Sequence, residues 1–432
     1  MTVASAAPGT GAVDHPGGGR RAWAVTGLLV VFMMVNFADK SVLGLAGDEI
    51  RADLHLSATE FGLANSAFFL LFSAAAIVVG LAADRVSPKV LLLVMAALWS
   101  VAQVPSALGG GLAVLIGSRV FLGAAEGPAF PVAQQATLSW FPDERRNLPA
   151  ALLTVGVTLG VMISAPGLTW LIQHHGWRSA LWVLSAVGAL WALVWAVYGA
   201  DSPRTGAPRT AAGAPRRPGI AYRRIFATRT WIGVTVAYFT SYWSVALMLV
   251  WLPSYLRHAV GYSASTAGTV VVAPAAVGAA VLFGQAWLTG RLMRRGASGR
   301  VARGRIGAGM LAIGAVALLL APSADGRGAQ TALIALGFGF GGAYATVAAT
   351  TVAELAPANR RGGALGLMNA LVTTAGLIGP AAVGALVDAQ GAAGYRHAVL
   401  LSGALVAAGA VVAYVLIDPE RDRARLTTTA SW

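Results

Sequence analysis

Four charged residues lie inside otherwise apolar segments of the chain: Asp39, Lys40, Arg119 and Glu126. Each surrounding segment has about twenty residues, which is long enough to cross the hydrocarbon core of a bilayer as a helix. An ionisable group inside such a helix is costly unless it is paired or hydrated, so it usually marks a pathway or a binding site. Two acids and two bases in two segments predict a site that handles a charged solute together with a proton.

Arg119 and Glu126 are seven residues apart, so a helix places them on one face, about two turns and roughly 10 Å from each other. At that separation each needs another partner or water. We expect Arg119 to bind an anion, because its planar guanidinium matches a carboxylate with two hydrogen bonds. We expect Glu126 to carry a proton, because a carboxylic acid removed from bulk water can hold one at neutral pH. The alternative is a structural charge network, although apolar residues would pack such an interface at lower cost.

Asp39 and Lys40 are adjacent, so their side chains project about 100° apart on a helix. One can then face Arg119 while the other faces a cavity. We expect Asp39 to be a second protonation site and Lys40 to contribute to anion binding, and a buried lysine can itself exchange a proton. The alternative is that both are rim charges in a wet funnel, since the apolar run ends near Ala46.

The composition excludes several classes of protein. Hydrophobic residues make up 57% and charged residues 11%, against about 45–50% and about 25% in soluble domains, which places the chain among membrane proteins. The net charge of +14 comes from basic residues dispersed in alternate loops, which does not indicate a nucleic-acid partner. The chain has no cysteine and no His or carboxylate cluster in its apolar runs, so we expect no metal site, no cofactor and no enzyme activity. The four charges form no ring, which disfavours a channel.

Twelve apolar runs predict an all-α membrane protein with two six-helix halves. The runs cover roughly 23–46, 60–83, 89–108, 112–138, 148–172, 179–199, 230–256, 265–290, 304–321, 329–352, 364–387 and 396–417. The expected domains are a disordered cytoplasmic tail (1–22), an N-terminal bundle (23–199), a cytoplasmic central loop (200–229), a C-terminal bundle (230–417) and a cytoplasmic tail (418–432).

Most of the 31 Lys and Arg residues fall in the tails, the central loop and alternate short loops. Cytoplasmic loops carry an excess of Lys and Arg, so this bias predicts that both termini are cytoplasmic. We therefore expect a multi-pass protein of the cell's inner membrane, in contact with the lipid bilayer and acting as a monomer. Residues 141–146 also match residues 356–361 at an offset of 215, which indicates a parallel repeat of the kind that places a site between two halves.

Residues 80–89, Gly-Leu-Ala-Ala-Asp-Arg-Val-Ser-Pro-Lys, resemble the loop motif between helices two and three of the major facilitator superfamily. Further strings resemble its anion:cation symporter family, which includes importers of sugar acids and other organic anions. These are 36–40, 53–57, 65–68, 119–127, 140–145 and 176–178. The resemblance implies the major facilitator fold. It also implies a cytoplasmic gate latch that involves Asp84, Arg85 and Lys89, with Arg145 and Arg360 at the matching helix entries of the two halves. Gly290 stands where the second copy of the motif has an aspartate.

The chain departs from this family at three positions of the expected site. Phe37 and Phe72 stand where tyrosine is common, and Lys40 stands where arginine is usual. The loss of two hydroxyl groups favours an aromatic or less hydroxylated carboxylate over a sugar acid. From the C-terminal half, Tyr242, Thr346 and Asn369 are polar candidates for the same cavity, although core packing explains such residues equally well.

The leading hypothesis is a secondary active transporter that imports an organic anion, a carboxylate, with protons by alternating access. A proton-coupled exporter of a drug or natural product is the alternative in the same class, and the direction of coupling would separate the two. A membrane receptor or enzyme is the alternative from another class, and it is disfavoured because the apolar segments carry no catalytic constellation. The sequence does not identify the substrate.

Overall fold

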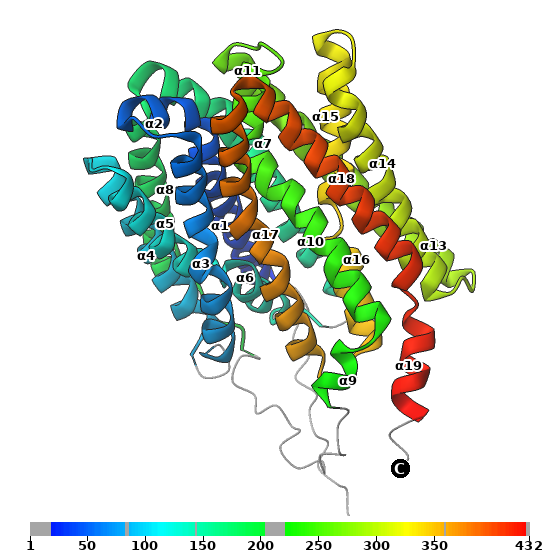
Figure 1. The fold of residues 1–432 in the computed structure, drawn as a ribbon. Coiled ribbons are helices and arrows are strands. Elements are labelled where there is room, and N and C mark those ends of the chain that lie inside the picture. The colour runs from blue at the N-terminus through cyan, green and yellow to red at the C-terminus, as the bar shows by residue number, and fades with distance from the viewer. Residues whose placement is uncertain (1–18, 83–85, 143–144, 204–220, 358–359, 429–432) are drawn as a thin grey trace, which may run out of the picture.

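The computed structural model describes residues 19–82, 86–142, 145–203, 221–357 and 360–428. These residues form helices and no strand. Within them, twelve helical spans are long and apolar enough to cross a membrane, which confirms the all-α membrane prediction. Figure 1 shows the spans as one bundle, with the short helices α2 and α11 at one end and α9 and α19 at the other.

The N-terminal half contains six of these spans. They are α1 (Arg20–Leu45), α3 (Ala58–Ala82), α4 (Pro88–Leu108), α5 with α6 (Leu112–Glu126 and Ala129–Leu138), α7 (Asn147–His175) and α8 (Trp177–Tyr198). The short helix α2 (Gly47–Leu54) connects α1 to α3. The fourth span is interrupted between α5 and α6 at Gly127 and Pro128, where proline has no N–H to continue the helical hydrogen bonds. Glu126 is therefore the last residue of α5.

The C-terminal half contains the other six spans. They are α10 (Arg229–Val250), α12 with α13 (Ala264–Val270 and Val272–Arg294), η2 with α14 and η3 (Arg300–Arg305, Ile306–Leu320 and Ala321–Ser323), α15 with α16 (Arg327–Gly342 and Ala345–Leu355), α17 (Arg361–Gln390) and α18 (Ala392–Leu416). Three short helices lie outside the spans: α9 (Tyr222–Phe226), α11 (Leu252–His258) and α19 (Pro419–Thr428). Helix α19 occupies part of the segment expected to be a tail.

Helix α11 was not expected, because the apolar pattern of 230–256 continues across its start. The structure ends α10 at Val250 and begins α11 at Leu252, with Pro253 in its first turn. Proline is tolerated in a first turn but not in a helix interior, so Pro253 separates two helices that hydropathy alone reads as one.

Each half packs mainly on itself, with α1 against α7, α3 against α5 and α14 against α18. One buried apolar cluster belongs to the N-terminal half and includes Phe32, Trp99 and Trp195. The other cluster extends across both halves and includes Phe61 and Trp251, whose ring centroids are 5.5 Å apart. The two halves are thus separate bundles that share one apolar interface.

Helices α3 and α17 form the most extensive junction between the halves, and Figure 1 shows them next to each other. At the α2 end, the Asp388 carboxylate of α17 accepts hydrogen bonds from the backbone N–H groups of Ala58 (2.8 Å) and Thr59 (2.7 Å). Asp388 therefore caps the first turn of α3 from the opposite half, where a negative charge is favourable. Further along, the hydroxyl groups of Ser73 and Thr373 also meet across this junction.

A second polar contact between the halves joins α2 to α11. Asp48 Oδ2 lies 3.0 Å from both Arg257 Nε and His258 Nε2, and Asp48 Oδ1 accepts a hydrogen bond from Ser254 at 2.9 Å. Arg257 Nη1 also contacts Glu49 Oε1 at 2.8 Å. We call these five residues the α2–α11 contact. They hold the two halves together at the end of the bundle opposite α9 and α19.

Candidate functional site

The four charged residues predicted from the sequence come from two helices of the N-terminal half, α1 and α5. Lys40 Nζ lies 3.1 Å from Glu126 Oε2, and their side chains are 11% and 0% exposed. Lys40 also donates a hydrogen bond to the side-chain oxygen of Asn36, one turn earlier in α1. A buried carboxylate and a buried ammonium group thus compensate each other, as buried charges must.

Three phenylalanine rings surround the Lys40 ammonium group. Its Nζ lies 4.6 Å from the ring centroid of Phe37, 5.7 Å from that of Phe72 and 6.0 Å from that of Phe68. A cation at these distances is attracted by the negative face of an aromatic ring, most strongly where water is excluded. Phe37 and Phe72 were predicted at the site, whereas Phe68 was not, because a phenylalanine in an apolar helix gives no separate signal.

Asp39 is fully buried, and among the described residues it forms no direct ion pair with a cation. Its Oδ1 accepts a hydrogen bond of 3.1 Å from Nε2 of Gln103 in α4, and its Oδ2 is buried without a hydrogen-bond partner among the described residues. The sequence analysis missed Gln103. A neutral amide inside an apolar segment was the available signal, because a buried amide needs a polar partner.

Arg119 belongs to α5, like Glu126, and is 4% exposed. Its guanidinium carbon lies 5.2 Å from the ring centroid of Phe68. Among the described residues, its buried Nε and Nη1 have no hydrogen-bond partner. Two buried donor groups of the guanidinium are therefore unoccupied, and the oxygen atoms of an anion can accept hydrogen bonds from them.

Two glycines set how closely α5 approaches α3, and so where the phenylalanine rings lie. A Cβ atom at Gly123 would lie 1.8 Å from the carbonyl oxygen of Phe68, and one at Gly127 would lie 2.0 Å from that of Phe72. Both distances are far inside van der Waals contact, so only glycine allows this backbone separation. The close packing brings Phe68 and Phe72 onto the charged residues of α1 and α5.

The C-terminal half contributes to this region through Tyr242 of α10. Its ring centroid lies 6.0 Å from that of Phe69, which in turn lies 5.9 Å from that of Phe72. Thr346 lies in the first turn of α16 and Asn369 lies exposed on α17, and the backbone carbonyl group of each accepts a hydrogen bond from a threonine one turn later. The described contacts do not link the side chains of Thr346 and Asn369 to the charged cluster, so their role stays a prediction.

The predicted gating residues are only partly described. Asp84 and Arg85 lie outside the described residues. The backbone of Lys89 links the start of α4 to α8 and the residues after it. Its N–H group donates a hydrogen bond to Asp201 Oδ1 at 2.9 Å, and its carbonyl group accepts one from Trp195 Nε1 at 3.0 Å. Arg145 is exposed, and the Arg360 guanidinium lies 4.6 Å from the Tyr222 ring centroid.

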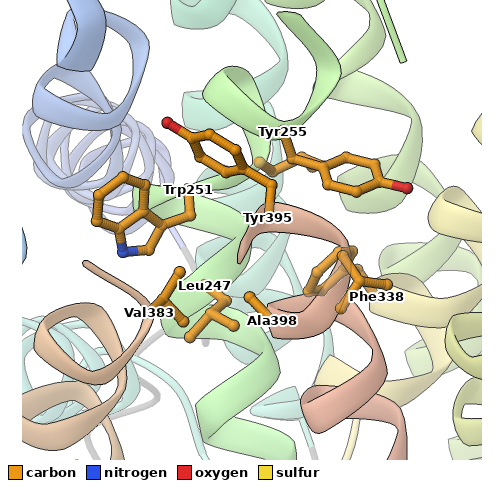
Figure 2. A pocket seen from close by; sticks show the side chains of 9 residues that line it. Leu247, Trp251, Tyr255, Phe338, Val383, Tyr395 and Ala398 are labelled. Atoms are coloured by element: carbon orange, nitrogen blue, oxygen red, sulfur yellow. The ribbon is translucent and has the colours of Figure 1, made fainter. Parts of the chain in front are cut away.

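A separate pocket lies in the C-terminal half near the α2–α11 contact (Figure 2). Its lining is aromatic and aliphatic and comes from α10, α11, α15, α17 and α18. Figure 2 shows the hydroxyl groups of Tyr255 and Tyr395 directed away from the apolar side chains Leu247, Val383 and Ala398. None of the predicted site residues lines this pocket. The described residues also contain no group of three His, Cys, Asp or Glu side chains that could hold a metal ion.

The sequence matches the family profile of the Major Facilitator Superfamily over residues 28–352 and 330–431. The chain belongs to this superfamily. It is therefore a membrane transporter and not an enzyme. Its structure is similar to that of a bacterial homologue of the human lysosomal transporter Spinster, solved in an inward-facing and unoccupied conformation. That similarity has a TM-score of 0.77 at 18% sequence identity and covers 96% of this chain and 99% of the other, which confirms the fold.

Three relatives match almost the whole chain. The probable sulfoacetate transporter of Cupriavidus necator is 30% identical over 91% of this chain and 93% of its own length. The hexuronate transporter of Bacillus subtilis is 28% identical over 90% and 94% of the two chains. The D-galactonate transporter of Escherichia coli is 28% identical over 90% and 95%. These relatives fit the resemblance to anion:cation symporters.

Proposed function

We propose that this transporter moves a small organic anion, a carboxylate, together with protons, and that it works as an importer by alternating access. One observation carries the proposal: Arg119 presents two buried donor groups that have no partner in the described part of the chain, beside the Lys40–Glu126 ion pair. The relatives named above support the substrate class, because sulfoacetate, hexuronate and D-galactonate are all organic anions. Proton coupling and direction rest on the charged cluster itself.

The charge balance of the cluster supplies the coupling. Asp39 and Glu126 compensate Lys40 and Arg119, so the cluster can be neutral when no substrate is bound. A carboxylate that binds Arg119 adds one negative charge to a buried site, which is costly unless a positive charge enters with it. A proton on either acid restores neutrality. Substrate binding then favours protonation, and protonation favours substrate binding to the same extent.

The ion pair indicates which proton matters most. When Glu126 is ionised, it occupies the Lys40 ammonium group at 3.1 Å. A proton on Glu126 removes this attraction, so Lys40 becomes available to the substrate carboxylate alongside Arg119. In this scheme the proton binds Glu126 and the anion binds Lys40. Neither is stable in the site without the other.

Alternating access requires the halves to separate at each end in turn. The α2–α11 contact and the Asp388 cap of α3 join the halves at one end of the bundle. We propose that this end faces outward and that the α9 and α19 end faces the cytoplasm, with both termini cytoplasmic in the inner membrane. The excess of Lys and Arg in the loops expected on that side supports this orientation.

The test is uptake of labelled carboxylates into liposomes that contain the purified full-length protein. We expect accumulation when the outside is more acidic than the lumen, and its loss when a protonophore collapses the gradient. Protein-free liposomes correct for weak acids that cross the bilayer unaided. Uptake without any response to the pH gradient would disprove proton coupling, and accumulation driven only by an acidic lumen would indicate export.

A further inference from the structure

Aromatic side chains of both halves form a continuous row beside the charged cluster. Phe37, Phe68 and Phe72 surround Lys40 at the distances given above. Phe68 and Phe72 have ring centroids 5.4 Å apart, and Phe68 also lies under the Arg119 guanidinium. Both cations of the site are thus flanked by aromatic rings.

The row continues into the C-terminal half through edge-to-face contacts. Phe69 lies 5.1 Å from Phe68 and 6.0 Å from Tyr242, with interplanar angles of 84° and 85°. Tyr242 lies 6.3 Å from Tyr238, with an angle of 88°. These separations and angles are those at which aromatic rings attract one another. We call Phe37, Phe68, Phe69, Phe72, Tyr238 and Tyr242 the aromatic row.

Part of the aromatic row lies at the interface between the halves. The ring of Phe69 packs directly over Gly376 of α17, where a Cβ atom would lie 2.7 Å from three ring carbons. Tyr242 meets Phe69 from α10, a helix of the opposite half. All members except Phe68 are only partly buried. Phe69 and Tyr242 thus place part of the row where the two halves meet.

Several hydrogen-bonding groups near this surface are already occupied by other side chains. The Gln103 amide is used by Asp39, the Asn36 oxygen by Lys40, and the Ser73 hydroxyl by Thr373. The side-chain nitrogen of Asn36 and the hydroxyls of Ser66, Ser118 and Ser241 are buried without a partner among the described residues, and the aromatic row adds two tyrosine hydroxyls. A polyhydroxylated anion would lose its hydrogen bonds to water here and regain only part of them.

We infer that the substrate is an aromatic monocarboxylate, whose carboxylate binds Arg119 and whose ring packs against the aromatic row. This inference rests on the proposed function, because it concerns the same site. The substrate carries one negative charge, because a proton on Glu126 leaves Lys40 and Arg119 with one excess positive charge over Asp39. The flat apolar body matches the edge-to-face geometry of the rings.

Equilibrium dialysis of the detergent-purified full-length protein tests the inference without interference from passive diffusion through a bilayer. The probes are labelled phenylacetate, an aromatic monocarboxylate, and labelled D-gluconate, a polyhydroxylated one. We expect phenylacetate to bind at least about tenfold more tightly than D-gluconate. Phe72→Leu removes a ring but keeps the site apolar, and it should weaken phenylacetate binding about fivefold.

Phe121→Leu is the matched control, because Phe121 lies on the same helix as Arg119 but is 44% exposed. It should leave phenylacetate binding unchanged. Tighter binding of D-gluconate than of phenylacetate would overturn the inference and leave the proposed function standing. Equal effects of Phe72→Leu and Phe121→Leu would also overturn it. If neither carboxylate binds, the inference is overturned, and the uptake of labelled carboxylates into liposomes decides the proposed function separately.

Discussion

Glu126 Oε2 lies 3.1 Å from Lys40 Nζ, although the two residues belong to different helices of an apolar bundle. Removing one partner of a buried ion pair leaves the other charge uncompensated, at a cost of about 3–5 kcal/mol. When Glu126 takes up a proton, the charge of Lys40 must therefore be compensated by another anion. That property ties the occupancy of Lys40 to the protonation of Glu126.

Glu126→Gln should abolish proton-driven accumulation of the substrate and spare exchange of substrate across the membrane at equal concentrations. Glutamine is a neutral isostere, so it imitates the protonated glutamate permanently and cannot release a proton. The measurement compares gradient-driven uptake with counterflow in liposomes. Accumulation against a gradient in this variant would show that Glu126 is not the coupling residue.

Two further variants make that result interpretable. Glu126→Gln leaves Lys40 unpaired, so the double variant with Lys40→Met should restore folding if the single variant unfolds. Asp53→Asn neutralises an acid at the α2 end, where Asp53 pairs with Arg178 and is 44% exposed. It should keep both activities, because exposed ion pairs contribute little.

Arg119→Lys should weaken substrate binding by about tenfold to a hundredfold, the value of one or two charged hydrogen bonds. Lysine keeps the positive charge but cannot make the paired contact of a guanidinium with a carboxylate. Arg178→Lys, at the exposed pair with Asp53, is the control and should bind normally. Near-normal affinity in Arg119→Lys would remove Arg119 from the site.

The twelve spans were predictable because they follow the hydropathy pattern of membrane helices. The charged cluster was predictable because its residues are exceptions to that pattern. Apolar runs of about twenty residues predict spans, and ionisable residues within them stand out individually. The pairing was not predictable. Lys40 contacts Glu126 while Asp39 contacts Gln103, and this choice depends on how α1, α4 and α5 dock. The spacing of residues along the sequence shows which side chains share one face of a helix. It does not show which neighbouring helix that face contacts.

The α2–α11 contact gave no signal in the sequence. Asp48, Glu49 and Arg257 lie just beyond apolar runs, where charges are common on any membrane protein. Their meeting depends on two short helices, one of which hydropathy merged with α10. Phe68 likewise became recognisable only through its place next to Lys40 and Arg119.

Gly123→Ala should destabilise the transporter and weaken substrate binding. The added Cβ would lie 1.8 Å from the Phe68 carbonyl oxygen, so α5 must move away from α3. Such overpacking costs about 1–3 kcal/mol, and the shift displaces Phe68 from Arg119. Gly117→Ala on the same helix meets no atom within 4 Å and should be neutral or stabilising. Apparent melting temperatures and binding of the two variants are compared, and equal values would contradict the close-packing argument.

Asp39 should be a second protonation site, which takes up a proton when an anion occupies Arg119 or Lys40. Its buried Oδ2 has no partner among the described residues and is free to carry that proton. The measurement is proton uptake on adding substrate to detergent-purified protein in weak buffer. Asp39→Asn should reduce the uptake. Unchanged uptake in this variant, or none in the wild type between about pH 5 and 8, would exclude Asp39 from this role.

Asp48→Asn should weaken the closure of the bundle at the α2–α11 contact. Burial alone would raise the pKa of Asp48, but the hydrogen bond from His258 and the charge of Arg257 outweigh it and lower the pKa below its usual value. A carboxylate with a lowered pKa stabilises the folded state above its unfolded pKa, about 3.9, and loses this contribution as the pH falls through the folded pKa.

The stability difference between wild type and Asp48→Asn should therefore be constant from neutral pH down to about pH 5 and vanish at lower pH. At neutral pH the apparent melting temperature should fall by about 2 °C or more. A cysteine pair placed across α2 and α11 should also crosslink more slowly in the variant, because the two helices spend less time in contact. Asp53→Asn, on the same short helix but paired within its own half, should change neither measurement. A melting difference that does not begin to shrink as the pH falls below about 4 would mean that the Asp48 charge does not hold this end of the bundle closed.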